Sequence, residues 1–160
     1  FLLVGICGGF QMLGEWITDP QGIEGTIDGA SGLGILPLRT EMLATKILQR
    51  AEYKGQEILK GLRVSGYEIH AGKSHLHQAK WIDLVEPSGL CVLDEKQKIL
   101  GTYLHGIFDK GEVANRLLQL TGKKIKSIPD HAQENLRELD RLADLIERHC
   151  NLSRILDGLC

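Results

Sequence analysis

The sequence predicts an α/β fold, and three patterns in its 160 residues lead to this class. Residues 1–6 form an apolar run broken only by Gly5, as expected of a parallel strand that is buried on both faces. Residues 99–104 are predicted to form a second strand of this kind. Residues 110–120 and 131–150 place apolar side chains at helical spacing. Buried strands combined with amphipathic helices predict helices that pack on a sheet.

The elements between these landmarks follow from local composition. A helix is expected over 8–17, directly after the first strand. The glycines of residues 19–34 predict a loop within the domain rather than a linker between domains. Further strands are expected over 42–49, 64–70, 81–85 and 89–93. Gly122 is expected to end the helix over 110–120.

The helix over 131–150 begins after Asp130, which together with Gln133 resembles a capping box. The helix carries an apolar stripe, formed by Leu136, Leu139, Ala143 and Ile146. Amphipathic helices normally bury this face on their own domain. We therefore expect the stripe to pack on the core rather than to bind a partner.

Composition and charge restrict the classes of function. A hydrophobic content of 42% is enough for one domain with a sizeable core. The net charge of -2, from 19 basic and 21 acidic residues, gives no electrostatic argument for binding nucleic acid or a membrane. The apolar runs are shorter than the roughly 20 residues of a membrane span. The cysteines at positions 7, 91, 150 and 160 lack CxxC spacing, which favours reduced thiols in the cytoplasm.

Cys7 follows the first strand directly and precedes Gly8 and Gly9. A reactive side chain on a sharp strand-to-helix turn is a nucleophile elbow, here with cysteine in place of serine. The turn would expose the thiol at the carboxyl end of the strand, where a helix N-terminus favours the thiolate. A buried structural cysteine is the alternative. The glycines favour catalysis, because a structural cysteine does not need a bare backbone on both sides.

The second strand ends in His105, which Gly106 follows. If the two strands are parallel members of one sheet, Cys7 and His105 both lie at carboxyl ends, where open α/β sheets place their sites. A thiol nucleophile needs a base, the amine that leaves needs an acid, and one imidazole can serve as both. We therefore expect His105 to be the catalytic partner of Cys7.

Five motifs occur together and in order: residues 5–11 (GICGGFQ), 19–25 (DPQGIEG), 32–37 (GLGILP), 66–72 (GYEIHAG) and 101–108 (GTYLHGIF). With these motifs the chain resembles the glutamine amidotransferase domain of the cobyric acid synthase family, within the class I, cysteine-type amidotransferase superfamily. The resemblance extends from Phe1 to about His149. It implies a flavodoxin-like sheet with helices on both faces.

The resemblance implies a role for each matching position. Cys7 matches the nucleophile, which attacks the side-chain amide of glutamine to give a glutamyl thioester and ammonia. The N–H of Gly8 matches one donor of the oxyanion hole, and His105 matches the general base. Gln11 matches a position that contacts bound glutamine. Tyr67 belongs to a motif expected at the mouth of the site, and we assign it to substrate binding.

The resemblance also implies partners beyond this segment. In the family, ammonia passes to a synthetase domain in cis, which uses ATP and magnesium to amidate carboxylates of a corrinoid acceptor. No Gly-x-x-x-x-Gly-Lys-Ser/Thr motif occurs here, so this segment is expected to bind no cofactor. The family's amidotransferase domain starts upstream of its nucleophile strand. We expect the chain to be the C-terminal part of that domain, without its N-terminal strands and nearly inactive by itself.

One position departs from the wider superfamily. Triad amidotransferases carry a glutamate two residues after the histidine, where this chain has Ile107. The resemblance to the cobyric acid synthase branch implies catalysis by a Cys–His dyad without a third residue, so Ile107 does not argue against activity. The group that orients His105 stays open between Asp109, Glu68 and a backbone carbonyl.

His70, His75 and His77 could suggest a zinc site. Cysteines and paired carboxylates are missing at ligand spacing nearby, and Lys73 and Lys80 add positive charge to the region. On the usual ligand patterns, no metal is therefore expected.

The favoured function is hydrolysis of glutamine by Cys7 and His105, which supplies ammonia for corrinoid amidation in cobalamin biosynthesis. One alternative keeps this chemistry with another acceptor, as in cobyrinic acid a,c-diamide synthase or in relatives that amidate a cell-wall lipid. The other alternative is a non-catalytic remnant of the fold. The intact Cys7, Gln11 and His105 argue against a remnant, because a protein without catalysis needs no thiol and imidazole at two strand ends.

Overall fold

The computed structural model describes residues 1–77, 81–124 and 126–150. The strands are β1 (Leu3–Ile6), β2 (Trp16–Thr18), β3 (Gly29–Ser31), β4 (Leu38–Lys54), β5 (Arg63–Leu76), β6 (Ile82–Asp83), β7 (Cys91–Asp94), β8 (Ile99–Thr102) and β9 (Leu104–His105). The helices are α1 (Gly8–Leu13), α2 (Gly111–Leu118) and α3 (His131–His149), with the 3-10 turns η1 (Glu57–Leu59) and η2 (Gln119–Thr121).

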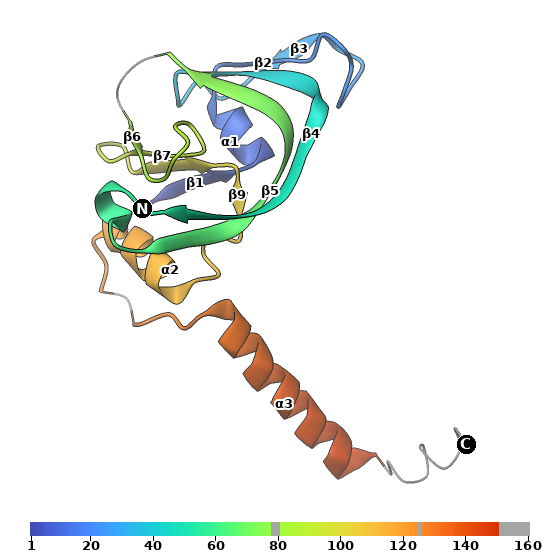
Figure 1. Ribbon diagram of the computed structural model, residues 1–160, viewed down its shortest axis with the longest axis vertical. Helices are drawn as coiled ribbons and strands as arrows, with labels where there is room; N and C mark the ends of the chain where they lie inside the picture. The colour runs from blue at the N-terminus through green and yellow to red at the C-terminus, as the bar shows by residue number, and fades with distance from the viewer. Residues whose placement is uncertain (78–80, 125, 151–160) are drawn as a thin grey trace.

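The strands form two sheets that enclose helix α1. The first sheet has the order β1-β8-β7-β6, and the second has the order β3-β2-β4-β5-β9. Helix α1 contacts β1 and β8 of the first sheet and β2, β4 and β5 of the second, as Figure 1 shows. The predicted α/β class is confirmed.

The parallel pairing of β1 with β8 brings the two landmark segments together. This pairing confirms that the strands before Cys7 and His105 are parallel neighbours. Gly5 and Gly101 are register partners within the pair. A Cβ atom on Gly101 would overlap the ring of Phe10, so glycine is required there for α1 to pack directly on the strands.

Helix α1 is shorter than the expected helix over 8–17, which is wrong in its second half. Gly14 has extended backbone, and the next N–H, of Glu15, donates to the Leu38 carbonyl at 2.8 Å. The chain then forms β2, which pairs in parallel with β4 and antiparallel with β3. Pairing with a distant strand therefore overrides the local helical pattern.

The strands β4 and β5 form a long antiparallel ribbon that curves around α1 (Figure 1). The expected strands over 42–49 and 64–70 lie inside it, and both are longer than expected because they pair along most of their length. The predicted strand over 99–104 is divided between the sheets. Its first part is β8, and after Tyr103 the chain joins the second sheet as β9, where His105 lies opposite Tyr67.

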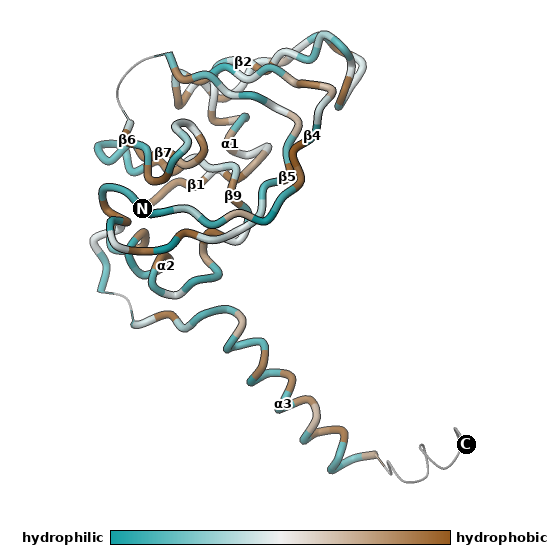
Figure 2. Tube along the Cα trace, in the orientation of Figure 1, coloured by the Kyte–Doolittle hydropathy of each residue, from teal (hydrophilic) through white to brown (hydrophobic). Residues whose placement is uncertain are grey.

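The hydrophobic core is formed by α1, α2 and the strands of both sheets. Figure 2 shows apolar residues along β1 and β7, whereas hydrophobic and hydrophilic residues alternate along α3. The largest fully buried side chains include Phe10, Leu36, Leu38, Leu93, Leu100, Leu104, Ile107 and Leu117. Burial of these side chains holds α1 against the two sheets and so positions the turn that carries Cys7.

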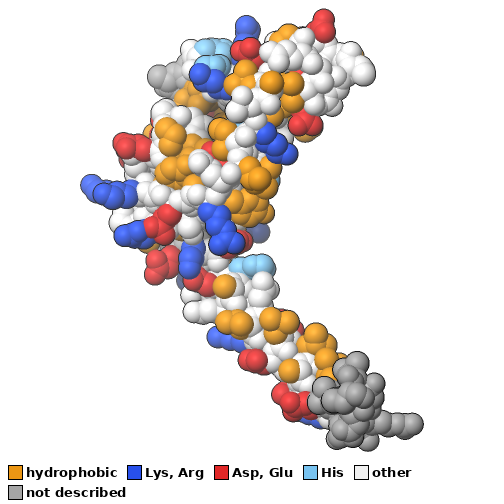
Figure 3. Space-filling model, turned by 45° about the vertical axis from the view of Figure 1, so that its right-hand side comes forward, with side chains coloured by type: hydrophobic (Ala, Val, Ile, Leu, Met, Phe, Trp, Pro, Cys, Tyr) orange, Lys and Arg blue, Asp and Glu red, His pale blue; other side chains and the backbone are white. Residues whose placement is uncertain are grey.

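The expectation that α3 packs on the core is wrong. The side chains of Leu136 and Leu139 are 63% and 59% exposed, and α3 contains no buried residue within its described length. Figures 1 and 3 show the helix projecting from the sheets with its apolar side chains on the surface. An amphipathic pattern predicts a helix, but burial also needs a facing surface, and the described residues place none beside this stripe.

The predicted capping box of α3 is also wrong, because the carboxylate of Asp130 has other partners. Asp130 accepts hydrogen bonds from the backbone N–H of Gly111 at 2.8 Å and from Nζ of Lys110 at 3.1 Å. These two bonds lower the pKa of Asp130 below its ordinary value. Asp130 therefore links the start of α3 to the start of α2 through hydrogen bonds.

No helix in the described ranges has the length and apolar character needed to cross a membrane.

Candidate active site

Cys7 occupies the sharp turn between β1 and α1. Its φ of 52° and ψ of -115° define a backbone conformation that residues other than glycine rarely adopt. Such strain typically costs about 1–3 kcal/mol, and residues that carry it cluster at functional sites. The positions of Gly8 and Gly9 are open, since a Cβ atom on either would meet nothing within 4 Å. The predicted elbow geometry is therefore confirmed.

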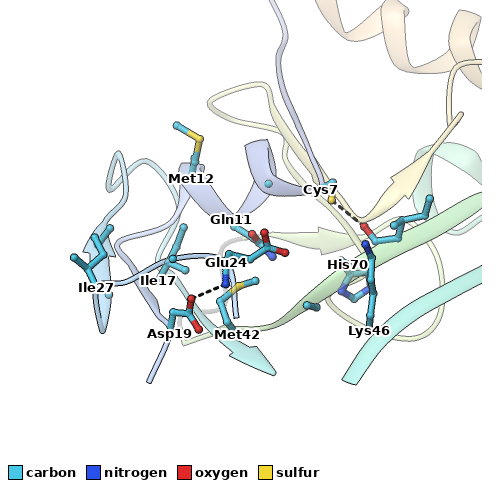
Figure 4. A pocket seen from close by; sticks show the side chains of 16 residues that line it. Cys7, Gln11, Met12, Ile17, Asp19, Glu24, Ile27, Met42, Lys46 and His70 are labelled. Atoms are coloured by element: carbon cyan, nitrogen blue, oxygen red, sulfur yellow. Dashed lines mark hydrogen bonds between the residues drawn. The ribbon is translucent and has the colours of Figure 1, made fainter. Parts of the chain in front are cut away.

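Cys7 lines a cavity of about 530 Å³, a volume typical of small-molecule sites. The cavity is bounded by α1, by the segment from β2 to β3, and by β4 and β5, as Figure 4 shows. Its polar and charged lining residues include Gln11, Asp19, Glu24, Lys46 and His70.

The thiol and the amide of Gln11 both contact groups far away in the sequence. Sγ of Cys7 donates a hydrogen bond to the carbonyl oxygen of Ile69 in β5 at 3.1 Å. Nε2 of Gln11 donates to the hydroxyl of Tyr103 at 3.3 Å, and the residue is 8% exposed. Gly72 makes room for this amide, because a Cβ atom there would overlap it. Both predicted residues therefore lie where a ligand of the cavity could meet them.

His105 is not among the described residues that line the cavity. Its ring stacks on Tyr67, with centroids 5.0 Å apart and planes inclined by 12°. Nε2 of His105 is buried and has no hydrogen-bond partner among the described residues. The stack orients the ring, and the nitrogen without a partner can accept a proton. Cys7 contacts Ile69, two residues from Tyr67 on the same strand, so β5 passes both predicted catalytic residues.

Glu68, one of the candidates for orienting His105, is bound by other groups. Its Oε1 accepts hydrogen bonds from the hydroxyl of Tyr53 at 2.6 Å and from Nε2 of Gln49 at 2.9 Å. Its Oε2 lies 3.3 Å from Nε2 of His70. Burial acts to raise the pKa of Glu68, but the three hydrogen bonds lower it below its ordinary value. Glu68 therefore orients His70, and Tyr67 is the group that contacts the ring of His105.

His70 is the imidazole on the wall of the cavity. Its motif, residues 66–72, was expected at the mouth of the site, but the sequence assigned this histidine no role. Its Nδ1 lies 2.8 Å from the carbonyl oxygen of Gly72, and its ring stacks on Tyr103 with centroids 3.9 Å apart. Both ring nitrogens thus face oxygen acceptors. The available signal was the two-residue spacing of Glu68 and His70, which places both side chains on one face of a strand.

Two other positions that the sequence singled out, His77 and Ile107, have defined surroundings in the structure. Nε2 of His77 lies 3.1 Å from Oε2 of Glu15 on the surface, so this histidine and His70 point to separate carboxylates. Ile107 is 1% exposed and packs in the core. The position at which triad relatives carry a glutamate is therefore an apolar core position in this chain.

Replacing Glu68 with glutamine is expected to lower the free energy of unfolding by about 1–3 kcal/mol at pH 7, because buried donors lose a charged acceptor. The pKa of Glu68 is lowered from 4.5 in the folded protein. The ionised carboxylate therefore contributes its full stabilisation of the fold above pH 4.5, and this stabilisation is lost as the pH falls through the lowered pKa. Urea unfolding of both proteins between pH 7 and pH 3 should show a difference that shrinks in acid.

Glu52→Gln is the matched control for this experiment, because Glu52 is an exposed carboxylate on the same ribbon that pairs with Arg63. Surface ion pairs of this kind contribute about 0–1 kcal/mol. Equal unfolding curves for the wild type and Glu68→Gln at pH 7 would show that the buried network does not stabilise the fold.

The fold and the elbow cysteine together define a class, that of α/β proteins with the arrangement of a glutamine amidotransferase. A solved structure described as a crystal structure of glutamine amidotransferase is similar to this chain, with a TM-score of 0.51. The similarity covers 76% of this chain and 61% of that one at 18% sequence identity, and it therefore concerns the fold alone.

The model of the CobB/CobQ-like glutamine amidotransferase domain matches residues 2–113, and the chain belongs to this family. Curated relatives include cobyric acid synthases from Synechocystis sp. and Nostoc punctiforme, each 38% identical over 98% and 96% of this chain, respectively. The cobyric acid synthase of Vibrio vulnificus is 40% identical over 96% of the chain. The chain spans about a third of the length of these relatives, 32–33% in each case.

Proposed function

We propose that this chain carries the glutamine-hydrolysing site of a cobyric acid synthase, which supplies ammonia for the amidation of corrinoid carboxylates in cobalamin biosynthesis. The observation that carries the proposal is the strained elbow of Cys7 on a cavity that Gln11 also lines. The family of the chain and its similarity to cobyric acid synthases support the choice of reaction and acceptor.

In the proposed reaction, Cys7 attacks the side-chain amide carbon of glutamine. The thiol first leaves its hydrogen bond to Ile69, and its proton passes to His105. As the carbon–sulfur bond forms, the amide oxygen becomes negative and accepts a hydrogen bond from the N–H of Gly8. The carbon–nitrogen bond then breaks, and His105 returns the proton to the nitrogen, which leaves as ammonia.

The second half of the reaction restores the enzyme. Water attacks the carbonyl carbon of the glutamyl thioester while His105 removes its proton. The carbon–sulfur bond breaks, glutamate leaves, and the thiol of Cys7 regains its proton. Gln11 contacts the bound glutamine. Tyr67 contributes to substrate binding at the mouth of the site, and its ring stacks on His105.

We further propose that the ammonia passes to an ATP- and magnesium-dependent synthetase domain of the same polypeptide, in the cytoplasm. The relatives are about three times as long as the part that this chain covers, which leaves room for such a domain. Among the described residues, β1 pairs with β8 alone. Its other edge could receive the strands that complete the sheet in the longer protein.

A glutamine analogue with a chloroketone in place of the amide tests this function. It should alkylate Cys7 selectively, and added glutamine should protect the thiol, as peptide mass spectrometry would measure. Cys91 is buried, which raises the pKa of its thiol to about 12, and Cys150 lies at the exposed end of α3. Cys160 lies outside the described residues. Equal labelling of Cys7 and Cys150, or no protection by glutamine, would contradict the proposal.

The 160 residues expressed alone are expected to be poorly soluble and nearly inactive. An open edge such as that of β1 promotes aggregation. The N–H of Gly8 is the one oxyanion-hole donor that the resemblance identifies in this segment, and an oxyanion hole that lacks one of its donors typically loses about a hundred- to a thousand-fold in rate. Glutamate release and the soluble fraction would be compared with those of a chain extended at its N-terminus as in the relatives. A soluble, monomeric and fully active 160-residue protein would contradict this expectation.

A further inference from the structure

The hydroxyl of Tyr103 contacts the side-chain amide of Gln11, and the reaction above gives Tyr103 no role. Tyr103 lies between β8 and β9, where the chain passes from one sheet to the other, and it is 3% exposed. Its hydroxyl oxygen lies 3.3 Å from Nε2 of Gln11. His105 follows two residues later, in β9. Tyr103 therefore connects the wall of the Cys7 cavity to the segment that carries His105.

Two aromatic contacts and a backbone hydrogen bond fix the ring of Tyr103. His70 stacks on it, with centroids 3.9 Å apart and planes inclined by 20°. Phe10 packs edge to face on it, with centroids 5.2 Å apart. The N–H of Tyr103 donates to the carbonyl of Leu90 at 2.9 Å. With its backbone and its ring both held, the hydroxyl stays beside Gln11, as precise positioning of a site requires.

The hydrogen bonds at this hydroxyl have a defined direction. Nε2 of Gln11 can only donate, so the hydroxyl oxygen of Tyr103 accepts. The hydroxyl proton therefore goes to Oγ of Ser74, 2.5 Å away, and Oγ of Ser74 lies 2.7 Å from Oγ1 of Thr40. Burial raises the pKa of Tyr103, which keeps this proton in place at neutral pH. A row of hydrogen bonds thus joins the amide of Gln11 to β5 and β4.

This direction determines which atom of the Gln11 amide is left for a ligand. Nε2 binds Tyr103, so Oε1 is the free end of the amide. Oε1 has no hydrogen-bond partner among the described residues, and it is not one of their fully buried atoms without a partner. It is therefore accessible from the cavity, which the side chain of Gln11 lines (Figure 4). The amide offers a hydrogen-bond acceptor there.

We propose that Tyr103 is a positioning residue, whose hydroxyl holds Gln11 so that Oε1 accepts a hydrogen bond from an N–H group of bound glutamine. This inference rests on the proposed hydrolysis of glutamine at Cys7. Tyr103 does not touch the substrate and acts through Gln11. Without the hydroxyl, the amide can rotate about its terminal bond, and ordering it then opposes binding of the substrate.

Replacing Tyr103 with phenylalanine keeps the ring and removes the hydroxyl. In the full-length protein, Tyr103→Phe should raise KM for glutamine by about 3- to 10-fold, the usual contribution of one hydrogen bond. The value of kcat should change by less than about twofold, because the lost interaction concerns binding rather than the transition state. Calorimetric titration of glutamine into Cys7→Ala protein, with and without Tyr103→Phe, should show a Kd that rises by the same factor.

A double-mutant cycle shows whether the effect passes through Gln11. Gln11→Met keeps the length of this side chain and removes its polar atoms. Adding Tyr103→Phe to Gln11→Met should raise KM and Kd no further, because the hydroxyl then has no amide to position. A further rise of about 3- to 10-fold in the double variant would overturn the inference, as would an unchanged Kd in Tyr103→Phe.

Two controls separate positioning from a general loss of structure. Thr121→Val removes a hydroxyl that donates to the carbonyl of Leu118 at 2.8 Å, outside the cavity lining, and should leave KM and Kd unchanged. Alkylation of Cys7 by iodoacetamide does not need Gln11 and should proceed at the same rate in the wild type and in Tyr103→Phe. Slower alkylation in this variant would overturn the inference, because the hydroxyl would then support the elbow itself.

The binding and rate measurements distinguish this inference from the proposed function. Binding of glutamine that weakens in Tyr103→Phe, without any hydrolysis by the wild type, would contradict the catalytic proposal alone. Hydrolysis by Cys7 with the same KM and Kd in Tyr103→Phe would contradict the positioning role alone.

Discussion

Replacing Cys7 with alanine is expected to abolish hydrolysis of glutamine, with kcat/KM falling on the order of ten-thousand-fold or more, because the covalent intermediate can no longer form. In the full-length protein, amidation driven by added ammonia should continue, since it does not pass through the thioester. Release of glutamate and amidation of the acceptor would be measured with glutamine and with ammonium salt. Normal use of glutamine by Cys7→Ala would show that the nucleophile is elsewhere.

Two controls separate chemistry from folding in this experiment. Cys150→Ala removes an exposed thiol at the end of α3 and should leave the rate unchanged. Cys7→Gly should be as inactive as Cys7→Ala but more stable by about 1 kcal/mol, because glycine relieves the positive φ at this turn. A glycine variant that is less stable than the alanine variant would show that the elbow is not strained.

Replacing His105 with alanine is expected to lower kcat for glutamine hydrolysis by about a hundred- to ten-thousand-fold, the usual contribution of general acid–base catalysis. The buried Nε2 that lacks a partner among the described residues is the atom that would carry the proton. Steady-state release of glutamate across a range of pH would measure the loss. Tyr67→Phe should retain most activity, because phenylalanine keeps the ring stack.

His77→Ala is the control for this prediction, since His77 pairs with Glu15 on the surface and should not affect the rate. His70→Gln tests the competing base, because His70 is the imidazole that lines the cavity itself. A loss of rate in His70→Gln together with activity within tenfold of the wild type in His105→Ala would reverse the roles of the two histidines.

Much of the catalytic end of the fold could be predicted from local sequence. The apolar run before Cys7 and the glycines after it specify a strand and a sharp turn, and these depend on neighbouring residues alone. The same reasoning placed a strand before His105, and the pairing of β1 with β8 meets the condition that this strand lies parallel to the first in one sheet. Five short motifs in order were enough to indicate the family to which the chain belongs.

The partners of side chains could not be predicted in this way. The thiol of Cys7 contacts a carbonyl 62 residues away, and Gln11 contacts a hydroxyl 92 residues away. The hydrogen bonds that join Glu68 to His70, Tyr53 and Gln49 also depend on the pairing of β4 with β5. Such contacts are set by how distant segments meet, and the sequence of either segment alone does not contain that information.

The predictions that the structure contradicts fail for the same reason, because contacts between distant segments override the local pattern. Residues 16–18 lie in β2 because β4 offers backbone partners there. Asp130 binds the start of α2 instead of capping its own helix. The sequence alone determined the sharp turn at Cys7, the strand that becomes β8 and the amphipathic character of α3. Tertiary structure alone decided the cavity, the charges of Glu24 and Lys46 on its walls and the exposure of that helix, because burial and electrostatics are properties of surfaces that form only when distant residues pack together.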